Sequence, residues 1–187
     1  MRKTPILAAA LLVGMAGAAQ ASPKTIDTSG PIQVLGKSDT AMCVDRTESS
    51  DVGDAMYWCN RAIMRAESTI DERAVAYLHR GVLHLREGRM KAAQADIGKS
   101  IELTPHYGDA HFNQGNIDFA AGRYDQAVAA YSKALGLGIT VPELAHYNRG
   151  QAYKRLGQAA QASADMEQAK LLADDKSALH HRLSSAR

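Results

Sequence analysis

The chain has 187 residues, of which 22 are lysine or arginine and 20 are aspartate or glutamate. This length suits one domain with its own core. A nucleic-acid-binding protein would carry a basic excess, because contacts to phosphates supply most of its affinity, so the near-neutral balance argues against that class. Aromatic residues make up only 5% of the chain, and such a composition packs helices closely through small side chains.

Residues 1–21 have the order of a secretory signal peptide, with Arg2 and Lys3, an apolar stretch and then Ala19-Gln20-Ala21. This order predicts cleavage after Ala21 and a periplasmic location. An uncleaved anchor is the alternative, but the apolar stretch is shorter than the roughly 20 residues of a membrane span. Cleavage would leave 20 basic and 20 acidic side chains. We expect no stable membrane insertion afterwards.

Residues 22–48 are expected to form an extended or disordered linker, because prolines and glycines recur between Pro23 and Gly36. The two cysteines of the chain, Cys43 and Cys59, follow the predicted cleavage point. An oxidising compartment favours a disulfide between them, which would close a loop of about 17 residues and contribute about 3 kcal/mol. Two unrelated buried thiols are the alternative. Within 49–73, apolar residues from Ala55 to Ala66 recur at helical spacing.

A pattern with a period of 34 to 35 residues occupies most of the remaining chain. Gly81, Gly115 and Gly150 recur at this period, and a second glycine follows each of them seven residues later. Further matched columns hold alanine, a large residue, a small residue and leucine. These columns are Ala93, Ala127 and Ala162; Ile97, Tyr131 and Met166; Ser100, Ala134 and Ala169; and Leu103, Leu137 and Leu172.

This register resembles the tetratricopeptide repeat (TPR), a unit of two antiparallel helices with small residues where the helices approach. The resemblance implies an all-α TPR solenoid with three units, at 74–107, 108–142 and 143–176. It also implies that 49–73 is a degenerate repeat helix and that the last helix caps the stack before a tail at 177–187. Departures occur as well, since His84 and Asp118 stand where the family usually has an aromatic residue.

In TPR proteins the first helix of each unit lines a concave groove that binds peptides or proteins. Carrying over the groove positions to the second and third units predicts a surface of aromatic rings, amides and one basic group. Amides can bond to a peptide backbone, and aromatic rings give a large contact at low entropy cost. The predicted partner-binding residues are Phe112, Asn113, Asn116, Phe119, Tyr147, Asn148, Gln151 and Arg155.

No motif for catalysis or for a cofactor is present. The chain has no nucleophile elbow, zinc-protease motif, P-loop or dinucleotide fingerprint, so we expect no enzyme and no cofactor. His111 and His146 occupy equivalent repeat positions, but no cysteine or acidic partner stands at metal-ligand spacing, and we expect no metal site.

These observations predict a periplasmic interaction module, an adaptor or scaffold that holds a protein or peptide of unknown identity in the groove. The alternative is a self-associating structural protein of the cell envelope, because the ends of an open stack can pair and form a homo-oligomer.

The first prediction concerns export. The protein recovered from the cell envelope should begin at Ser22, and its intact mass should lack residues 1–21. Retention of Met1 through Ala21 in that mass would contradict cleavage and with it the soluble periplasmic form.

Overall fold

The computed structural model describes residues 37–49 and 51–185, and the regular secondary structure of these residues is entirely α-helical. The helices are α1 (Asp39–Thr47), α2 (Val52–Met64), α3 (Ile70–Arg86), α4 (Met90–Leu103), α5 (Gly108–Ala120), α6 (Tyr124–Leu137), α7 (Pro142–Arg155) and α8 (Ala159–Ser185). Within this part of the chain, no helix is both long and apolar enough to span a membrane.

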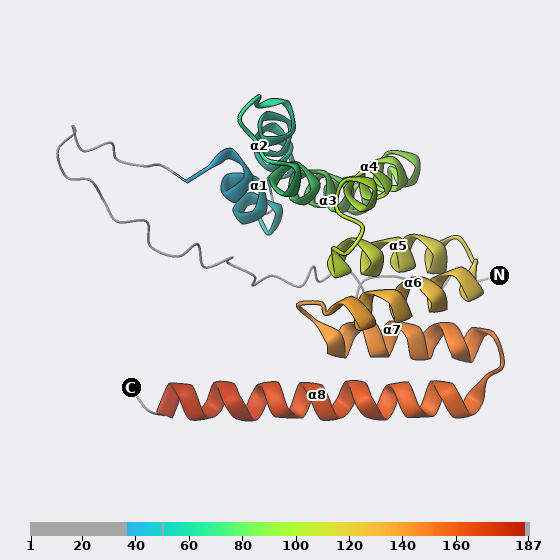
Figure 1. The fold of residues 1–187 in the computed structure, drawn as a ribbon. Helices are drawn as coiled ribbons and strands as arrows, with labels where there is room; N and C mark the ends of the chain where they lie inside the picture. Colours follow the sequence, from blue (N-terminus) through green and yellow to red (C-terminus); the bar gives the residue numbers. More distant parts are fainter. Residues whose placement is uncertain (1–36, 50, 186–187) are drawn as a thin grey trace.

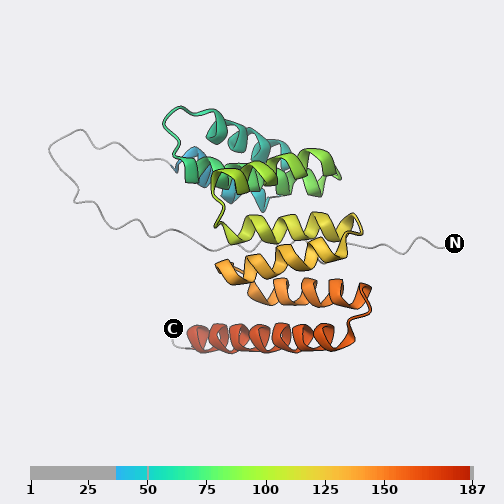
Figure 2. The ribbon, with the colours of Figure 1, turned by 45° about the vertical axis from the view of Figure 1, so that its right-hand side comes forward.

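The helices form four hairpins that stack in sequence order (Figures 1 and 2). The members of each hairpin pack together, and the second helix of a hairpin also packs on the first helix of the next one. This arrangement confirms the predicted all-α solenoid. Such a stack is stabilised by contacts within hairpins and between neighbouring hairpins, with few contacts over longer distances.

The N-terminal part differs from the prediction, because residues 39–47 of the expected linker form α1. Two local features explain this helix: the Ser38 hydroxyl accepts a hydrogen bond from the Ala41 amide at 3.1 Å, and Asp39 lies in the first turn. Helix α1 gives the degenerate repeat a short first helix, and α2 is its second. The predicted signal peptide and residues 22–36 of the predicted linker lie outside the described residues.

Two further boundaries differ from the prediction. Helix α3 begins at Ile70, before the expected start at 74, because Thr69 and Glu72 form a capping box. Helix α8 continues to Ser185, through most of the predicted tail at 177–187. Lys176, the residue before this extension, pairs with Glu143 at the start of α7, at 2.9 Å.

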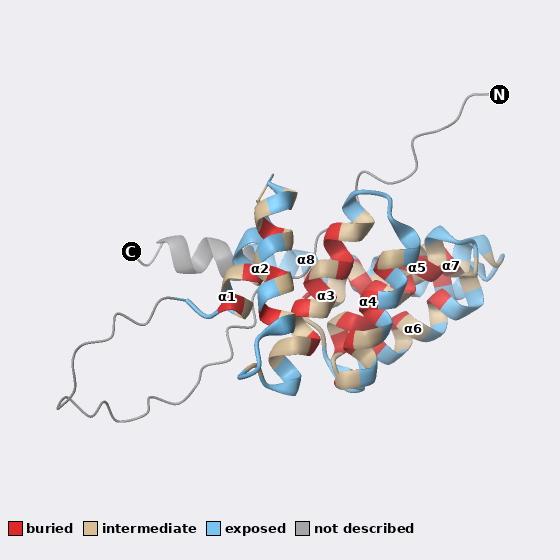
Figure 3. Cartoon of the chain, turned by 90° about the horizontal axis from the view of Figure 1, so that it is seen from above, coloured by how far each residue is buried: buried red, intermediate tan, exposed pale blue. Residues whose placement is uncertain are grey.

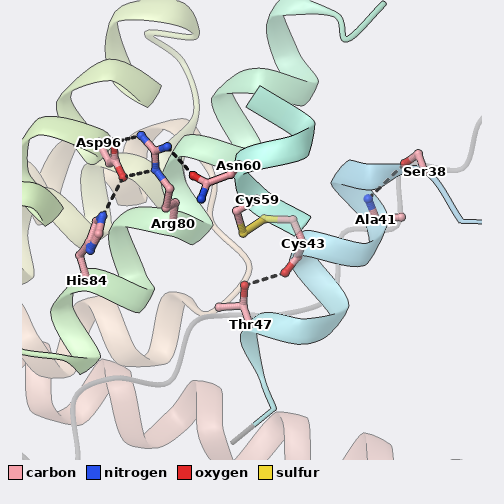
Figure 4. The surroundings of a disulfide bond; sticks show 9 residues. All are labelled: Ser38, Ala41, Cys43, Thr47, Cys59, Asn60, Arg80, His84 and Asp96. Atoms are coloured by element: carbon pink, nitrogen blue, oxygen red, sulfur yellow. Dashed lines mark hydrogen bonds and ion pairs between the residues drawn. A yellow bond between two sulfur atoms is a disulfide. The ribbon is translucent and has the colours of Figure 1, made fainter. Parts of the chain in front are cut away.

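The predicted disulfide is present, and it joins α1 to α2 (Figure 4). Cys43 and Cys59 are both fully buried, and their Cα atoms are 4.6 Å apart. The C-terminal end of α1 is also held by α3, because Arg86 donates to the carbonyl oxygens of Thr47 and Ser49 at 2.6 and 3.0 Å. The short first hairpin is therefore tied both within itself and to its neighbour.

The buried residues, red in Figure 3, form three clusters within the described part of the chain, and each cluster is completed by the hairpin that follows. The first helix of the next hairpin supplies two residues spaced by seven, so both lie on one face. The completing pairs are Ala76 and Leu83 from α3, Ala110 and Ile117 from α5, and Ala145 and Ala152 from α7. Each cluster therefore needs residues from two consecutive hairpins, and a single hairpin could not bury it.

The glycines of the repeat serve two physical purposes. Gly88, Gly122 and Gly157 adopt φ angles of 72°, 76° and 74° in the turns between helices, where other residues are strained. Gly115 instead allows close approach, since a Cβ atom there would lie 2.5 Å from Cε1 of Tyr131. The Tyr131 ring is 1% exposed and has no room to retreat.

Two arginines each connect three helices, and Figure 4 shows the first of them. Arg80 on α3 donates two hydrogen bonds to Asp96 on α4, each at 2.7 Å, and a third to Asn60 on α2 at 2.8 Å. Its repeat counterpart Arg149 on α7 donates to Asp165 on α8 at 2.7 and 2.8 Å and to Ser132 on α6 at 2.9 Å. We call these two groups the arginine clamps.

The second prediction compares two glycines. Gly115→Ala should lower the free energy of unfolding by about 1–3 kcal/mol, because the added methyl group overpacks the contact with Tyr131. Gly98→Ala is the matched control on α4, where a Cβ atom would meet nothing within 4 Å, and it should raise stability by about 0.5–1 kcal/mol. Urea unfolding followed by circular dichroism measures both. Equal effects of the two substitutions would refute the close-approach argument.

Candidate functional site

Three of the eight predicted groove residues are buried, so they do not belong to an open binding surface. Phe112 is 1% exposed and packs against the Tyr131 ring with a centroid distance of 5.8 Å. Asn113 donates to the Asp109 carbonyl oxygen of its own helix at 2.9 Å, and Asn148 is 7% exposed. These three side chains point into the stack: Phe112 packs in the third core cluster, Asn113 bonds to its own helix, and Asn148 bonds to Asn116 on α5.

Asn116 belongs to a hydrogen-bonded network that supports the surface. Its side-chain oxygen accepts a bond from the Tyr131 hydroxyl at 2.9 Å and another from Asn148 at 3.0 Å. Burial raises the pKa of the Tyr131 hydroxyl well above its usual value, so Tyr131 stays a neutral donor. The network joins α5, α6 and α7 and fixes the position of the Asn116 side chain. The side-chain oxygen of Asn116 already accepts two hydrogen bonds.

An aromatic pair flanked by a cation lies at the end of α5. The rings of Phe119 and Tyr124 meet edge to face, with centroids 5.4 Å apart. The guanidinium carbon of Arg155 lies 6.0 Å from the centroid of the Tyr124 ring, which is at the outer limit of a cation–π contact. Phe119 also packs partly on the third core cluster. This pair therefore combines structural support with an accessible edge.

Tyr147, Gln151 and Arg155 form a stripe along α7, because their spacing of four places them on one helix face. Tyr147 is 46% exposed, Gln151 is partly exposed and Arg155 is exposed. An aromatic ring, an amide and a guanidinium in line can supply apolar contact, two-way hydrogen bonding and charge. The stripe, with Asn116 and Phe119 beside it on α5, is what remains of the predicted surface.

Helix α3 contributes little to such a surface. Leu78 and Val82, at equivalent repeat positions, are 1% exposed. His79 is 5% exposed, and burial lowers the pKa of its imidazole to about 4, so it is neutral at pH 7. Its Nδ1 atom has no hydrogen-bond partner among the described residues. Among these groove positions, the accessible side chains therefore lie on α5 and α7.

The two histidines considered as metal ligands have separate partners. His111 is bonded to the Pro105 carbonyl oxygen at 2.8 Å, whereas His146 contacts Asp165 at 2.8 Å. The described residues contain no group of three or more histidine, cysteine or acidic side chains arranged to hold a metal ion. Burial alone would raise the pKa of the Asp165 carboxyl, but bonds from Arg149 and His146 lower it. His146 thus supports an arginine clamp.

Sequence reasoning missed the arginine clamps. A signal was available, because Arg80 and Asp96 lie 16 residues apart and so do Arg149 and Asp165. The second unit has Gln114 and Ala130 at the corresponding positions, so the pattern is incomplete and easily overlooked.

A shallow hollow of about 550 Å³ lies at the opposite end of the molecule, away from the α7 stripe. Arg61 and Arg65 from α2 line it, and both pair with Asp39, at 3.2 and 3.4 Å. Arg65 also pairs with Glu67 at 3.2 Å. Asp39 pairs with both arginines and Glu67 with one of them, so the hollow presents no unpaired arginine to a ligand.

Comparison with known proteins assigns the class of the chain. The family model "TPR repeat" matches residues 115–157, and the model "Tetratricopeptide repeat" matches 74–107 and 144–176. Together these matches span residues 74–107 and 115–176, about half of the chain, and they include the whole candidate surface. The chain therefore belongs to the tetratricopeptide-repeat family.

The individual proteins that match do so over part of their length or at low sequence identity. Tetratricopeptide repeat protein 6 of Homo sapiens is 38% identical over 72 residues, which is 38% of this chain but only 14% of that protein. Two crystal structures of MamA match with TM-scores of 0.61 and 0.59, each at 20% identity over 74% of this chain, and the matches cover 78% and 73% of the MamA chains. At this identity the likeness shows the fold alone.

The third prediction follows from buried His79. Unfolded histidine has a pKa near 6.5 and folded His79 one of about 4, so the unfolded state binds more protons between these pH values. The free energy of unfolding should therefore fall as pH drops from about 6.5 toward 4, by up to about 3 kcal/mol from this residue.

Urea titrations at pH 7 and pH 4.5 test this contribution. His79→Leu should lose less stability between the two pH values than the wild type, because no buried imidazole remains to be protonated. His106→Leu, which changes an exposed histidine, should keep the wild-type difference. An unchanged pH dependence in His79→Leu would count against the prediction.

Proposed function

We propose that this protein is a periplasmic interaction scaffold that holds a protein or peptide partner against the surface of Asn116, Phe119, Tyr147, Gln151 and Arg155. The observation that carries the proposal is the α7 stripe: a large aromatic side chain, 46% exposed, is followed at helical spacing by an amide and a guanidinium. Aromatic and arginine side chains are the residues most often found at the energetic centre of interfaces. Membership of the TPR family supports an interaction role.

Two observations support the location. The sequence begins with the order of a signal peptide, and Cys43 and Cys59 form a disulfide, a bond that persists in oxidising compartments and is rare in the cytosol. A periplasmic scaffold needs no cofactor, and the proposal assigns no catalytic residue.

Self-association in the cell envelope is the second candidate. Tyr57, Met64 and Ile70 at the N-terminal end are 53%, 84% and 55% exposed, and uncovered apolar side chains of this kind favour contacts between copies. Sedimentation of the mature protein at several concentrations distinguishes the candidates, because only self-association makes the sedimentation coefficient rise with concentration.

The fourth prediction tests the surface with the native partner. A photoreactive residue at Gln151 should cross-link that partner in the intact envelope, and mass spectrometry then identifies it. With the partner purified, Tyr147→Ala should weaken binding more than tenfold, because an aromatic anchor at the centre of an interface typically contributes about 2 kcal/mol or more. Arg155→Ala should have a smaller effect that shrinks as salt is added.

The matched control is Tyr57→Ala, which removes a similarly exposed tyrosine from α2 at the other end of the stack. All variants must show wild-type helicity and melting temperature. If a folded Tyr147→Ala protein binds the partner as tightly as wild type, the α7 stripe is not the binding surface.

A further inference from the structure

The last hairpin has a core that nothing completes within the described residues. In the second and third clusters, Leu78 and Phe112 are covered by the first helix of the following hairpin and are each 1% exposed. Their repeat counterpart in α7 is Tyr147, which is 46% exposed. Ala162 and Ala169 on α8 are 8% exposed, whereas their counterparts Ala127 and Ala134 are fully buried.

The edge of this core is basic where the earlier cores are apolar. Leu85 and Phe119 pack against the second and third clusters, but the residue at their position in α7 is Lys154. Likewise, Ile101 and Leu135 are replaced by Lys170 on α8. Both lysines are exposed, and neither forms an ion pair with any side chain that the structure describes. The surface is therefore an apolar centre between two unpaired positive charges.

The completed cores show what kind of element fits such a centre. In each case it is a single α-helix that presents two apolar residues spaced by seven, and its first contact residue is alanine. Alanine is required because the helix backbones approach closely, as ridges of one helix enter the grooves of another. Acidic side chains beside this stripe would complement Lys154 and Lys170.

We propose that this open end, formed by Tyr147, Ala162, Met166 and Ala169 between Lys154 and Lys170, binds one amphipathic helix of another protein. The helix carries small residues seven apart with acidic residues on either side, and it takes the place of the first helix of a further repeat. The inference deepens the proposed function and rests on it, since both use Tyr147. It replaces a general peptide partner with a defined helical one.

A second copy of this chain fits the open end less well. Helix α1 is the first helix of the stack, so it is the element that would follow in a continued array. It has nine residues, and Glu48, a charged residue outside the helix, stands seven after Ala41. Such a helix cannot place two small residues over Tyr147 and Met166.

The fifth prediction uses a synthetic helix as the probe. The peptide has the sequence of residues 142–155 with Arg149→Glu, Lys154→Glu and Arg155→Glu, and a side-chain cross-link on its outer face keeps it helical. It retains Ala145 and Ala152, the pair that completes the third cluster. Titrated into the isotope-labelled mature protein, it should shift the amide signals of Tyr147, Ala162, Met166 and Ala169 in a saturable manner.

Matched variants separate the contributions. Tyr147→Ala should weaken binding of the peptide at least tenfold, and Lys170→Glu should weaken it several-fold, with a loss that shrinks as salt is added. Tyr57→Ala should leave it unchanged, because Tyr57 lies on α2 at the other end of the stack. A control peptide with Ala145→Gln and Ala152→Gln should bind at least tenfold more weakly, since the larger side chains hold the backbones apart.

Three outcomes would overturn the inference. Absence of saturable binding would do so, and so would concentration-dependent dimerisation that Tyr147→Ala abolishes, because the occupant would then be a second copy. The third outcome concerns an uncross-linked peptide with Gln151→Pro, which cannot form the helix. The inference fails if this peptide binds as tightly as the cross-linked one and shifts the signals of Asn116 and Phe119. In that case the proposed function would still hold, but its ligand would be an extended peptide. The proposed function itself is tested separately, by cross-linking the native partner.

Discussion

The structure depends on one recurring contact, in which the first helix of a hairpin completes the core of the hairpin before it. Ala110 and Ala145 are fully buried in this role, and both are small because two helix backbones must approach across them. Since each hairpin needs its neighbour, stability is shared along the stack. The same dependence leaves the final hairpin with an unfinished core, and the candidate site lies there.

Polar interactions strengthen the junctions unevenly. The arginine clamps connect α2 with α3 and α4, and α6 with α7 and α8, whereas α5 has Gln114 where the clamps have arginine. A buried charged group is destabilising unless it is paired. Asp96 and Asp165 are buried, and each accepts two hydrogen bonds from its arginine. The first and last repeat units are thus clamped to the preceding hairpin, and the middle unit is not.

The residues of the candidate surface differ in how much they contribute to the stability of the stack. Asn116 and Phe119 help to hold the stack together, through the Tyr131 network and the third cluster, so their substitution would disturb both structure and binding. Tyr147 has no such internal duty in the described residues, because the core that would cover it lacks a closing helix. A binding energy centred on Tyr147 would therefore come at little cost to folding, which makes this residue the best single test of function.

The sequence by itself determined the solenoid, because the repeated glycines and alanines allow helices to approach only at those points, and it predicted the Cys43–Cys59 bond from compartment and spacing. The tertiary structure alone decided which groove positions are accessible. Phe112 and Tyr147 occupy the same repeat position, yet the first is 1% and the second 46% exposed. Periodicity treats them as equivalent, whereas burial depends on whether another hairpin follows. Helix α1 escaped prediction for a related reason, since a short helix is marginal alone and this one forms where a disulfide and Arg86 hold it against its neighbours.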